Sequence, residues 1–531
     1  DYDELKNEIK EAEKEREKEY GGILKNFGII SKSSAAVADG EISAESSDAA
    51  NATGTGEKAE SFASTNKQVD AVDVSKILPD ESYFNFSEMY IYGDKLIAVG
   101  SKTEYEEKKA KEEDEEADGS DYVDGIYYNY YEGETYSYIY SYDISDRSNP
   151  ELVDKYEQSG YYNSSRMIGT YVYLISTYGR SYYYGYKNRD FIPCAGDGEE
   201  KEELAINDIC GVDGAEYERY SVIGAVDVKN GKSKKTKAII GVNEQIYCNE
   251  KNLYLTGTYY KDDTEYTRIV KYSLDGTDID LKASGKAKGS VNDQFSMDEK
   301  DGNLRIALTD YRWGVGKDKN YLYVLDKNLE IIGQTEGFAK NEHIEAVRFI
   351  GDTAYVITFE RTDPLFIIDL KNPKEPKITG EVKIDGFSSS LTPIDENTLL
   401  GIGFCTSDEE WGVVRDGLKL VLFDISDKNN PKVLDEYEFK NYNSDAQYSH
   451  KAITINNEDG YFAIPFEHYS YDDEEDEVTF GAMVIRADKD SLSVKKYYTD
   501  ERVNRCTYIG NYLYVPSAEW DSHGVFSFEI Q

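Results

Sequence analysis

Three arginines stand at related places in repeated segments of the chain and could together bind an anion. Arg166 lies in SSRMIG, Arg348 in AVRFIG and Arg505 in NRCTYIG, each shortly before a turn that contains glycine. A guanidinium group presents paired N–H donors that match a carboxylate or a sulfate. A ring of these arginines would bind such a group. Alternatively, each arginine ties neighbouring repeats together through a buried carboxylate, and the sequence leaves both interpretations open.

Three further polar residues are expected near the same strands. Asn292 and Gln294, in NDQFSMDE, occupy a similar place, and His450, in SHKAI, opens the first strand of a repeat. The chain has four histidines, and none belongs to an H-E-x-x-H or H-x-H pattern. His450 could therefore face a central channel as a ligand-binding group or serve there as a hydrogen-bonded wall residue.

The cysteines do not predict a metal site. There are five, none paired at metal-ligand spacing. Cys194 and Cys210 lie in one loop-like segment, where a disulfide would stabilise the fold by about 3 kcal/mol by restricting the unfolded loop. Two independent buried thiols are the alternative.

The acidic runs at 106–121 and 472–477 resemble calcium loops only loosely, because they lack the D-x-D-x-D-G spacing. We predict no cofactor, with calcium binding by such loops as the alternative to solvated loops. No G-x-S-x-G nucleophile elbow is present. With 104 acidic residues, a pair of carboxylates for glycoside hydrolysis is uninformative.

A repeated pattern must position these residues. Eight times between residues 92 and 516, a turn of Gly, Asn or Asp is followed by a short alternating apolar strand. The copies are YGDKLIAVG, IGTYVYLIS, NEKNLYLTG, KDGNLRIAL, IGDTAYVIT, IDENTLLGIG, NEDGYFAIP and IGNYLYVPS. A second pair of strands follows most copies, so each repeat is predicted to be a four-stranded antiparallel sheet.

An aspartate recurs at the end of the third strand of these repeats. The residues are Asp143, Asp227, Asp275, Asp326, Asp369, Asp424 and Asp488. Because turn residues such as Gly, Asn or Pro follow them, we expect their carboxylates to accept hydrogen bonds from the turn backbone rather than to form a metal array.

The eighth repeat supplies only three strands, and the segment 69–78 alternates as a strand does. Pairing it onto the last repeat would close a ring and remove both exposed edges. The sequence therefore predicts an all-β fold, an eight-bladed β-propeller over residues 67–531, with seven blades as the alternative. Residues 1–30 are expected to form a helical arm, and residues 31–66, rich in Ser, Ala, Gly and acidic residues, a linker.

The longer repeats carry insertions between the second and third strands. They fall at 103–135, 178–219, 310–319, 405–416, 470–478 and 517–523. Antiparallel alternation puts these insertions on one face of the predicted fold. Tyrosine-rich stretches at 122–140 and 178–186 lie in or beside them and could contact protein or sugar.

The net charge of −44 disfavours nucleic acid as a partner. No apolar run approaches the roughly 20 residues of a membrane span, and the chain starts without the pattern of a signal peptide. We expect a trimmed or mature end, and a signal or tether upstream of residue 1 is left open.

Several stretches resemble a family of secreted bacterial and archaeal proteins with a C-terminal β-propeller domain distantly similar to WD repeats. They are STNKQV, SSRMIG, NDQFSMDE, AVRFIGDTAYVITF, DPLFIIDL, GFSSSL, FDISDKNNP and SHKAI. The resemblance covers about residues 65–531. It implies an exported protein with an arm and linker before the propeller, and no known reaction.

We therefore expect an extracellular or surface-tethered, non-enzymatic module that binds a protein or glycan at the cell envelope through its insertion-bearing face. The first alternative is an extracellular hydrolase or lyase with its site at the channel mouth. The second is a structural envelope component stabilised by calcium.

Overall fold

The computed structural model describes most of the chain from residue 84 onward. The described residues are 77, 84–105, 133–179, 191–197, 201–212, 219–231, 233–261, 264–311, 318–359, 362–409, 412–457, 459–472, 475–488, 490–519 and 524–530. The predicted arm, the linker and, apart from Ile77, the predicted closing strand at 69–78 lie outside these residues.

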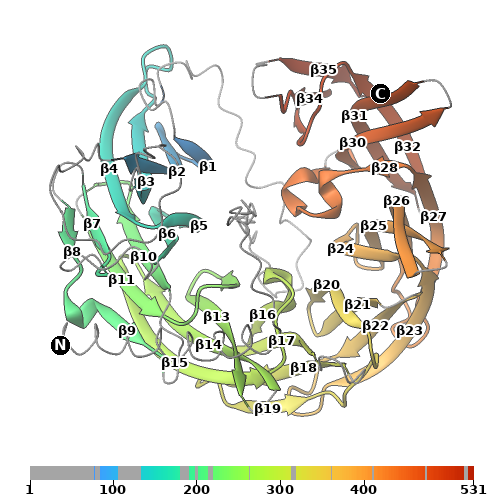
Figure 1. Ribbon diagram of the computed structural model, residues 1–531, viewed down its shortest axis with the longest axis horizontal. Helices are drawn as coiled ribbons and strands as arrows, with labels where there is room; N and C mark the ends of the chain where they lie inside the picture. Colours follow the sequence, from blue (N-terminus) through green and yellow to red (C-terminus); the bar gives the residue numbers. More distant parts are fainter. Residues whose placement is uncertain are drawn as a thin grey trace, which may run out of the picture. The chain divides into compact units, whose positions relative to one another are not determined.

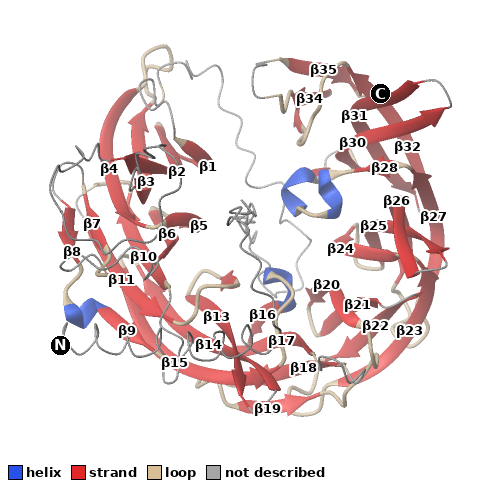
Figure 2. Cartoon of the chain, in the orientation of Figure 1, coloured by secondary structure: helices blue, strands red, loops and turns tan. Residues whose placement is uncertain are grey.

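Strands dominate the described chain, and only short 3₁₀ turns interrupt them (Figure 2). The chain divides into two compact units. Unit 1 includes Asp70–Asn243 and the turn Asp275–Ile279, and unit 2 includes Glu244–Leu274 and Asp280–Gln531. Among the described residues, no helix has the length and apolar character needed to cross a membrane.

Unit 1 contains two sheets (Figure 1). The first is made of β1 (Asn85–Tyr92), β2 (Lys95–Tyr105), β3 (Gly133–Asp143), β4 (Glu151–Ser159), β7 (Cys194–Gly196) and β8 (Lys201–Glu203). The second is made of β5 (Tyr161–Ile168), β6 (Tyr171–Tyr178), β10 (Tyr220–Asp227), β11 (Lys234–Ile240) and β9 (Ile209–Gly211), with the 3₁₀ helix η4 (Ile206–Asp208) before β9.

Unit 2 contains the other sheets (Figure 1). The first of them is made of β12 (Ile246–Cys248), β13 (Asn252–Lys261), β14 (Thr264–Asp275) and β15 (Asp278–Lys288). The second is made of β16 (Met297–Lys300), β17 (Asn303–Asp310), β18 (Lys319–Leu325) and β19 (Ile331–Gln334). The third is made of β20 (His343–Ile350), β21 (Thr353–Phe359), β22 (Thr362–Asp369) and β23 (Lys377–Asp385). The 3₁₀ helix η5 (Gln294–Ser296) precedes β16.

The remaining sheets of unit 2 follow in chain order. The fourth is made of β24 (Phe387–Pro393), β25 (Thr398–Glu409), β26 (Gly412–Asp424) and β27 (Lys432–Lys440). The fifth is made of β28 (Tyr442–Asn443), β29 (Thr454–Asn456), β30 (Tyr461–Asp472), β31 (Glu475–Asp488) and β32 (Ser491–Thr499). The sixth is made of β33 (Thr507–Ile509), β34 (Tyr512–Pro516) and β35 (Val525–Glu529). The 3₁₀ helices η6 (Asp445–Gln447) and η7 (His450–Ala452) precede β29.

The all-β prediction and the repeated four-stranded antiparallel sheet are confirmed. Alternate residues of the strands face the neighbouring sheet, as the period of two requires. In unit 2, for example, Leu400 and Leu420 belong to one buried cluster with Ile464 and Met483 of the next sheet. Many tyrosine side chains are buried in the same way. Within the stretch 122–140, the described Tyr136, Tyr138 and Tyr140 are buried.

Each sheet has two kinds of end. We call the end where the second strand finishes and the third begins the loop end, and the opposite end the turn end. Aspartates at the turn end cap the backbone as expected: Asp143 accepts from Ser145 N at 2.8 Å, and Asp424 from Ser426 N at 2.9 Å. Asp227, Asp326 and Asp369 do the same.

The described part of the insertion at 178–219 is built into sheets. The β7–β8 hairpin pairs with β4, and β9 pairs in parallel with β11. It therefore covers the outer edges of both sheets of unit 1 instead of standing free. The insertions at 405–416 and 470–478 are largely strand as well, because they extend the β25–β26 and β30–β31 hairpins.

Candidate functional site

In unit 2, the segments that lead into the innermost strands bring several predicted residues together at the loop ends. The Asp293 carboxylate caps η5 by accepting from Ser296 N at 2.9 Å. This turn buries Gln294 and leaves the Phe295 ring between two predicted residues. The His450 ring meets Phe295 edge-on at 5.0 Å, and the Arg348 guanidinium lies 5.7 Å from its centroid. Asn292, Gln294, Phe295, Arg348 and His450 are here called the Phe295 site.

Arg348 lies in a partly buried place on β20. Burial lowers its pKa to about 10, and the nearby carboxylates Asp298 and Asp293 oppose that shift. Asp298 is itself buried and paired with Arg305, whose Nε lies 2.7 Å from Asp298 Oδ2. Burial raises the pKa of Asp298 although Arg305 opposes the change. The Arg348 guanidinium beside Phe295 thus interacts electrostatically with two carboxylates, Asp293 and Asp298.

Glu345 on β20 is a functional candidate that the sequence did not suggest. It falls at a β-bulge between Ile344 and Ala346, where the register with β21 shifts. Burial raises the pKa of its carboxyl to about 7, against the nearby positive charge of Arg415. In the described residues this carboxylate accepts no hydrogen bond. A half-buried carboxyl with such a pKa is typical of functional sites.

The positions of these groups are fixed by hydrogen bonds between consecutive sheets. Gln245 Nε2 donates to Asn292 O at 3.4 Å, and Asn292 Nδ2 donates to Glu345 O at 3.0 Å. Farther along unit 2, Ser389 Oγ donates to Gln447 O at 2.5 Å. The Phe295 site and Glu345 therefore share one framework. Arg415 is held near it by packing on Phe387 and Phe404, with its guanidinium carbon 5.0 and 4.5 Å from the ring centroids.

Aromatic side chains are exposed at the same loop ends. Tyr260, Tyr311 and Tyr448 are 63%, 37% and 59% exposed. Tyr311 stacks on His343 with 4.5 Å between centroids, and burial raises the pKa of Tyr311, with Glu345 adding to the shift. His343 Nδ1 is buried without a partner in the described structure.

The other predicted arginines lie elsewhere. Arg166 belongs to unit 1, where its side chain donates to Ser164 Oγ at 2.9 Å and to Ser165 O at 2.6 Å. Arg505 is exposed, and its described neighbour is Asp445 of η6. Burial raises the pKa of Asp445, and Arg502 and Arg505 oppose that shift. Of the three arginines, only Arg348 belongs to the Phe295 site.

The disulfide that the spacing of Cys194 and Cys210 allowed is not formed. Cys194 lies on β7, which joins the sheet of β4, whereas Cys210 lies on β9, which joins the sheet of β11. Among the described residues, no group of three or more His, Cys, Asp or Glu side chains is arranged to hold a metal ion. The acidic run at 106–121, and part of that at 472–477, lies outside the described residues.

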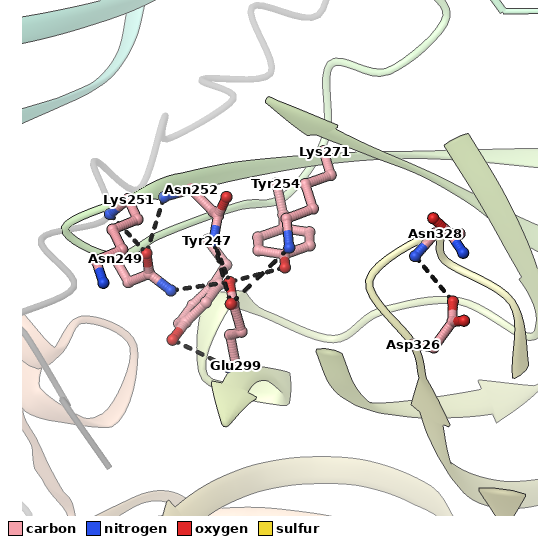
Figure 3. Close-up of polar contacts among 9 residues, drawn as sticks. All are labelled: Tyr247, Asn249, Lys251, Asn252, Tyr254, Lys271, Glu299, Asp326 and Asn328. Atoms are coloured by element: carbon pink, nitrogen blue, oxygen red, sulfur yellow. Dashed lines mark hydrogen bonds and ion pairs between the residues drawn. The ribbon is translucent and has the colours of Figure 1, made fainter. Parts of the chain in front are cut away.

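A second polar cluster of unit 2 surrounds Glu299 at the turn end of β16 (Figure 3). Its carboxylate accepts from Asn249 Nδ2 at 3.0 Å, Asn252 Nδ2 at 2.8 Å and Tyr254 Oη at 2.8 Å. Lys271 Nζ lies 3.9 Å away. All four partners come from the β12–β15 sheet or the turn within it. Asn252 Nδ2 also donates to the other carboxylate oxygen, Oε1, at 3.1 Å. Both oxygens of Glu299 are thus satisfied, and the cluster ties two sheets together.

Comparisons with known proteins place the chain among repeated β folds. A family model described as "Beta propeller domain" matches residues 57–521. An uncharacterized protein of Archaeoglobus fulgidus is 40% identical over 255 residues, 48% of this chain and 36% of that protein. Uncharacterized protein MJ1554 of Methanocaldococcus jannaschii is 39% identical over 259 residues, 48% of this chain and 37% of that protein. The matched segments thus span little more than a third of these curated relatives.

Two solved structures are similar at low identity. One is the β-propeller domain of the trilobed protease from Pyrococcus furiosus, at 10% identity and a TM-score of 0.33, covering 79% of this chain and 99% of that one. The other is the Pyrococcus horikoshii acylaminoacyl peptidase, at 11% identity and a TM-score of 0.34, covering 82% and 58%.

Proposed function

Because the chain belongs to the family of beta propeller domains, we propose that it is a non-enzymatic binding module that holds a protein or glycan at the loop ends of unit 2. The proposal includes an eight-bladed propeller closed by the segment 69–78. It also includes secretion or tethering at the cell surface, which the resemblance to exported proteins supports. Sheets built from the described strands number eight, as that blade count requires.

One observation carries the binding role: exposed aromatic side chains and the Glu345 carboxyl lie at the same strand ends. Tyr311 and Tyr448 offer rigid amphipathic area, and Glu345 lies nearby without a hydrogen bond in the described structure. At the turn ends, by contrast, aspartates bond their own turn backbone. The loop ends are therefore the better surface for a partner.

The test is retention of envelope proteins and glycans from the producing cell on the immobilised full chain. A Tyr311→Ser, Tyr448→Ser double variant should lose at least tenfold in retention. The matched control is Tyr437→Ser, since Tyr437 is also 37% exposed but lies on the outer strand β27. Equal retention by both variants would refute the assignment of the surface.

A second candidate function is hydrolysis or elimination on a polysaccharide or peptide. This function is favoured by Glu345, because a pKa near 7 suits proton transfer. Glu345 also lies beside the Phe295 site, which contains Arg348 and His450. The assay is release of new reducing ends or amines from envelope polymers. Activity that Glu345→Gln abolishes while the fold is kept would establish the enzyme and displace the binding role.

A further inference from the structure

The outer side of unit 2 has a hollow of about 370 Å³ between the β12–β15 and β16–β19 sheets. Its volume falls within the range of small-molecule sites. The side chains that matter for its chemistry are Tyr266, Lys286, Lys288, Tyr321, Tyr323 and Gln334. None of them belongs to the Phe295 site.

The hollow exists because one outer strand is short. β19 has four residues, whereas the outer strands β15, β23 and β27 have 11, 9 and 9. After Gln334 the chain leaves the regular ladder, and Thr335 Oγ1 accepts from Leu322 N at 3.0 Å. Fewer outer-strand side chains are therefore available to cover the first half of β18.

Gly337 helps to keep this space open. A Cβ atom at Gly337 would lie 3.0 Å from the Tyr321 hydroxyl and 2.8 Å from Lys319 Cδ. Any larger residue would push the Tyr321 side chain from its place. The absence of a side chain at this position thus preserves the position of an aromatic ring that lines the hollow.

The lining combines aromatic faces with cations. The Tyr321 and Tyr323 rings lie 5.8 Å apart at 32°. Lys288 Nζ is held 2.7 Å from Asp310 Oδ2, so its charge is partly neutralised. Lys286 is exposed and makes no ion pair within the described residues. In a chain with a net charge of −44, this lysine gives the hollow a local positive charge.

We propose that the hollow binds a sugar ring bearing a carboxylate, such as a uronic-acid residue of an acidic glycan. The apolar C–H face of the ring packs on Tyr321, and Tyr hydroxyls and Gln334 hydrogen-bond its hydroxyl groups. The Lys286 ammonium pairs with the carboxylate. This inference goes beyond the proposed function and stands whether or not the loop ends bind a partner.

The test is calorimetric titration of the full chain with tetragalacturonate and, in parallel, with neutral β-1,4-galactotetraose. Tetragalacturonate should bind with a dissociation constant on the order of 1 mM or tighter and more weakly as salt rises. The neutral sugar should bind at least tenfold more weakly. Equal binding of the two sugars, or no binding of either, would overturn the proposal.

Variants locate the binding. Lys286→Glu and Tyr321→Ala should each weaken tetragalacturonate binding at least tenfold. Lys327→Glu is the matched charge reversal, because Lys327 is exposed in a turn outside the hollow. Lys286→Glu changes an exposed side chain and keeps the fold, which its melting curve checks. Unchanged binding in Lys286→Glu would show that the sugar sits elsewhere and would overturn the site.

Discussion

Two glutamates on the innermost strands of neighbouring sheets have opposite surroundings. Glu299 on β16 accepts hydrogen bonds from two asparagines and a tyrosine and faces Lys271. Glu345 on β20 is also partly buried, yet its carboxylate accepts no hydrogen bond in the described structure, and the nearby charge of Arg415 opposes the rise in its pKa without reversing it. The first lies at a turn end and the second near a loop end.

The difference separates architecture from function. A buried carboxylate with all its hydrogen bonds formed rigidifies its neighbours, whereas one without them costs free energy in the folded state. Such a cost persists where another benefit compensates for it, and the binding role proposed above would supply that benefit at Glu345. The hydrogen bonds of Glu299 hold two sheets together, whereas Glu345 is the carboxyl that the proposed binding role would use.

The largest effect is expected for Glu299→Ala. It leaves two amides, a hydroxyl and the Lys271 ammonium without their acceptor in a nearly buried place. The expected loss is about 3–5 kcal/mol in the free energy of unfolding, measured from urea denaturation at pH 8. Glu345→Ala is the matched variant and should change that free energy by about 1 kcal/mol or less. Similar losses in both variants would remove the contrast between the two glutamates.

The surroundings of Glu157 in unit 1 are intermediate between those of Glu299 and those of Glu345. It is 1% exposed, with ion pairs to Lys155 at 3.3 Å and to Lys201 at 3.8 Å. Lys201 also pairs with Glu104 at 2.9 Å and lies 3.5 Å from the Tyr136 ring centroid. These contacts fasten the β7–β8 hairpin to the sheet of β4.

Lys201→Met should therefore cost about 1–3 kcal/mol, because it leaves Glu157 with Lys155 alone. Amide hydrogen exchange in 194–203 should become at least tenfold faster. Lys235→Met is the control, since Lys235 and its partner Asp278 are both more than half exposed. Unchanged exchange in Lys201→Met would mean that backbone pairing alone holds the hairpin.

The sequence predicted the repeats well because the alternation of apolar residues and the turn residues are local signals. It also pointed to Asn292, Gln294, Arg348 and His450, which precede or begin innermost strands. Glu345 could not be found in this way, because its place depends on a bulge in the register with β21. Arg415 falls in the insertion that the sequence predicts at 405–416, but in the structure it lies on strand β26. The residues that donate hydrogen bonds to the Glu299 carboxylate lie 45 to 50 positions away along the chain, and no local pattern marks such a distance.

A smaller effect should appear in the pH dependence of stability. The folded pKa of Glu345, about 7, lies above its ordinary value of 4.5. The folded state therefore holds a proton that the unfolded state releases, and stability falls as pH rises from about 4.5 to about 7. Allowing for partial exposure, this contribution is about 1–2 kcal/mol.

Glu345→Gln keeps the shape of the protonated acid and should lose this part of the pH dependence. Urea midpoints at pH 5 and pH 8 should draw closer together in the variant than in the parent. Glu330→Gln, an exposed site, should leave the difference as it is. A parent and a Glu345→Gln variant with the same pH dependence would show that Glu345 is ionised in the folded state at pH 5.

The smallest change in stability is expected for Tyr448→Ala, although its effect on binding should be large. Tyr448 is 59% exposed, and its ring approaches the Phe404 ring edge-on with 5.4 Å between centroids. Truncation should therefore alter the free energy of unfolding by about 0.5 kcal/mol or less, measured in the same urea series. If Tyr448 instead served to pack the loop end, its truncation would lower the free energy of unfolding several times more, as large-to-small changes in a core do. That outcome would make the loop end, like the Glu299 cluster, part of the architecture.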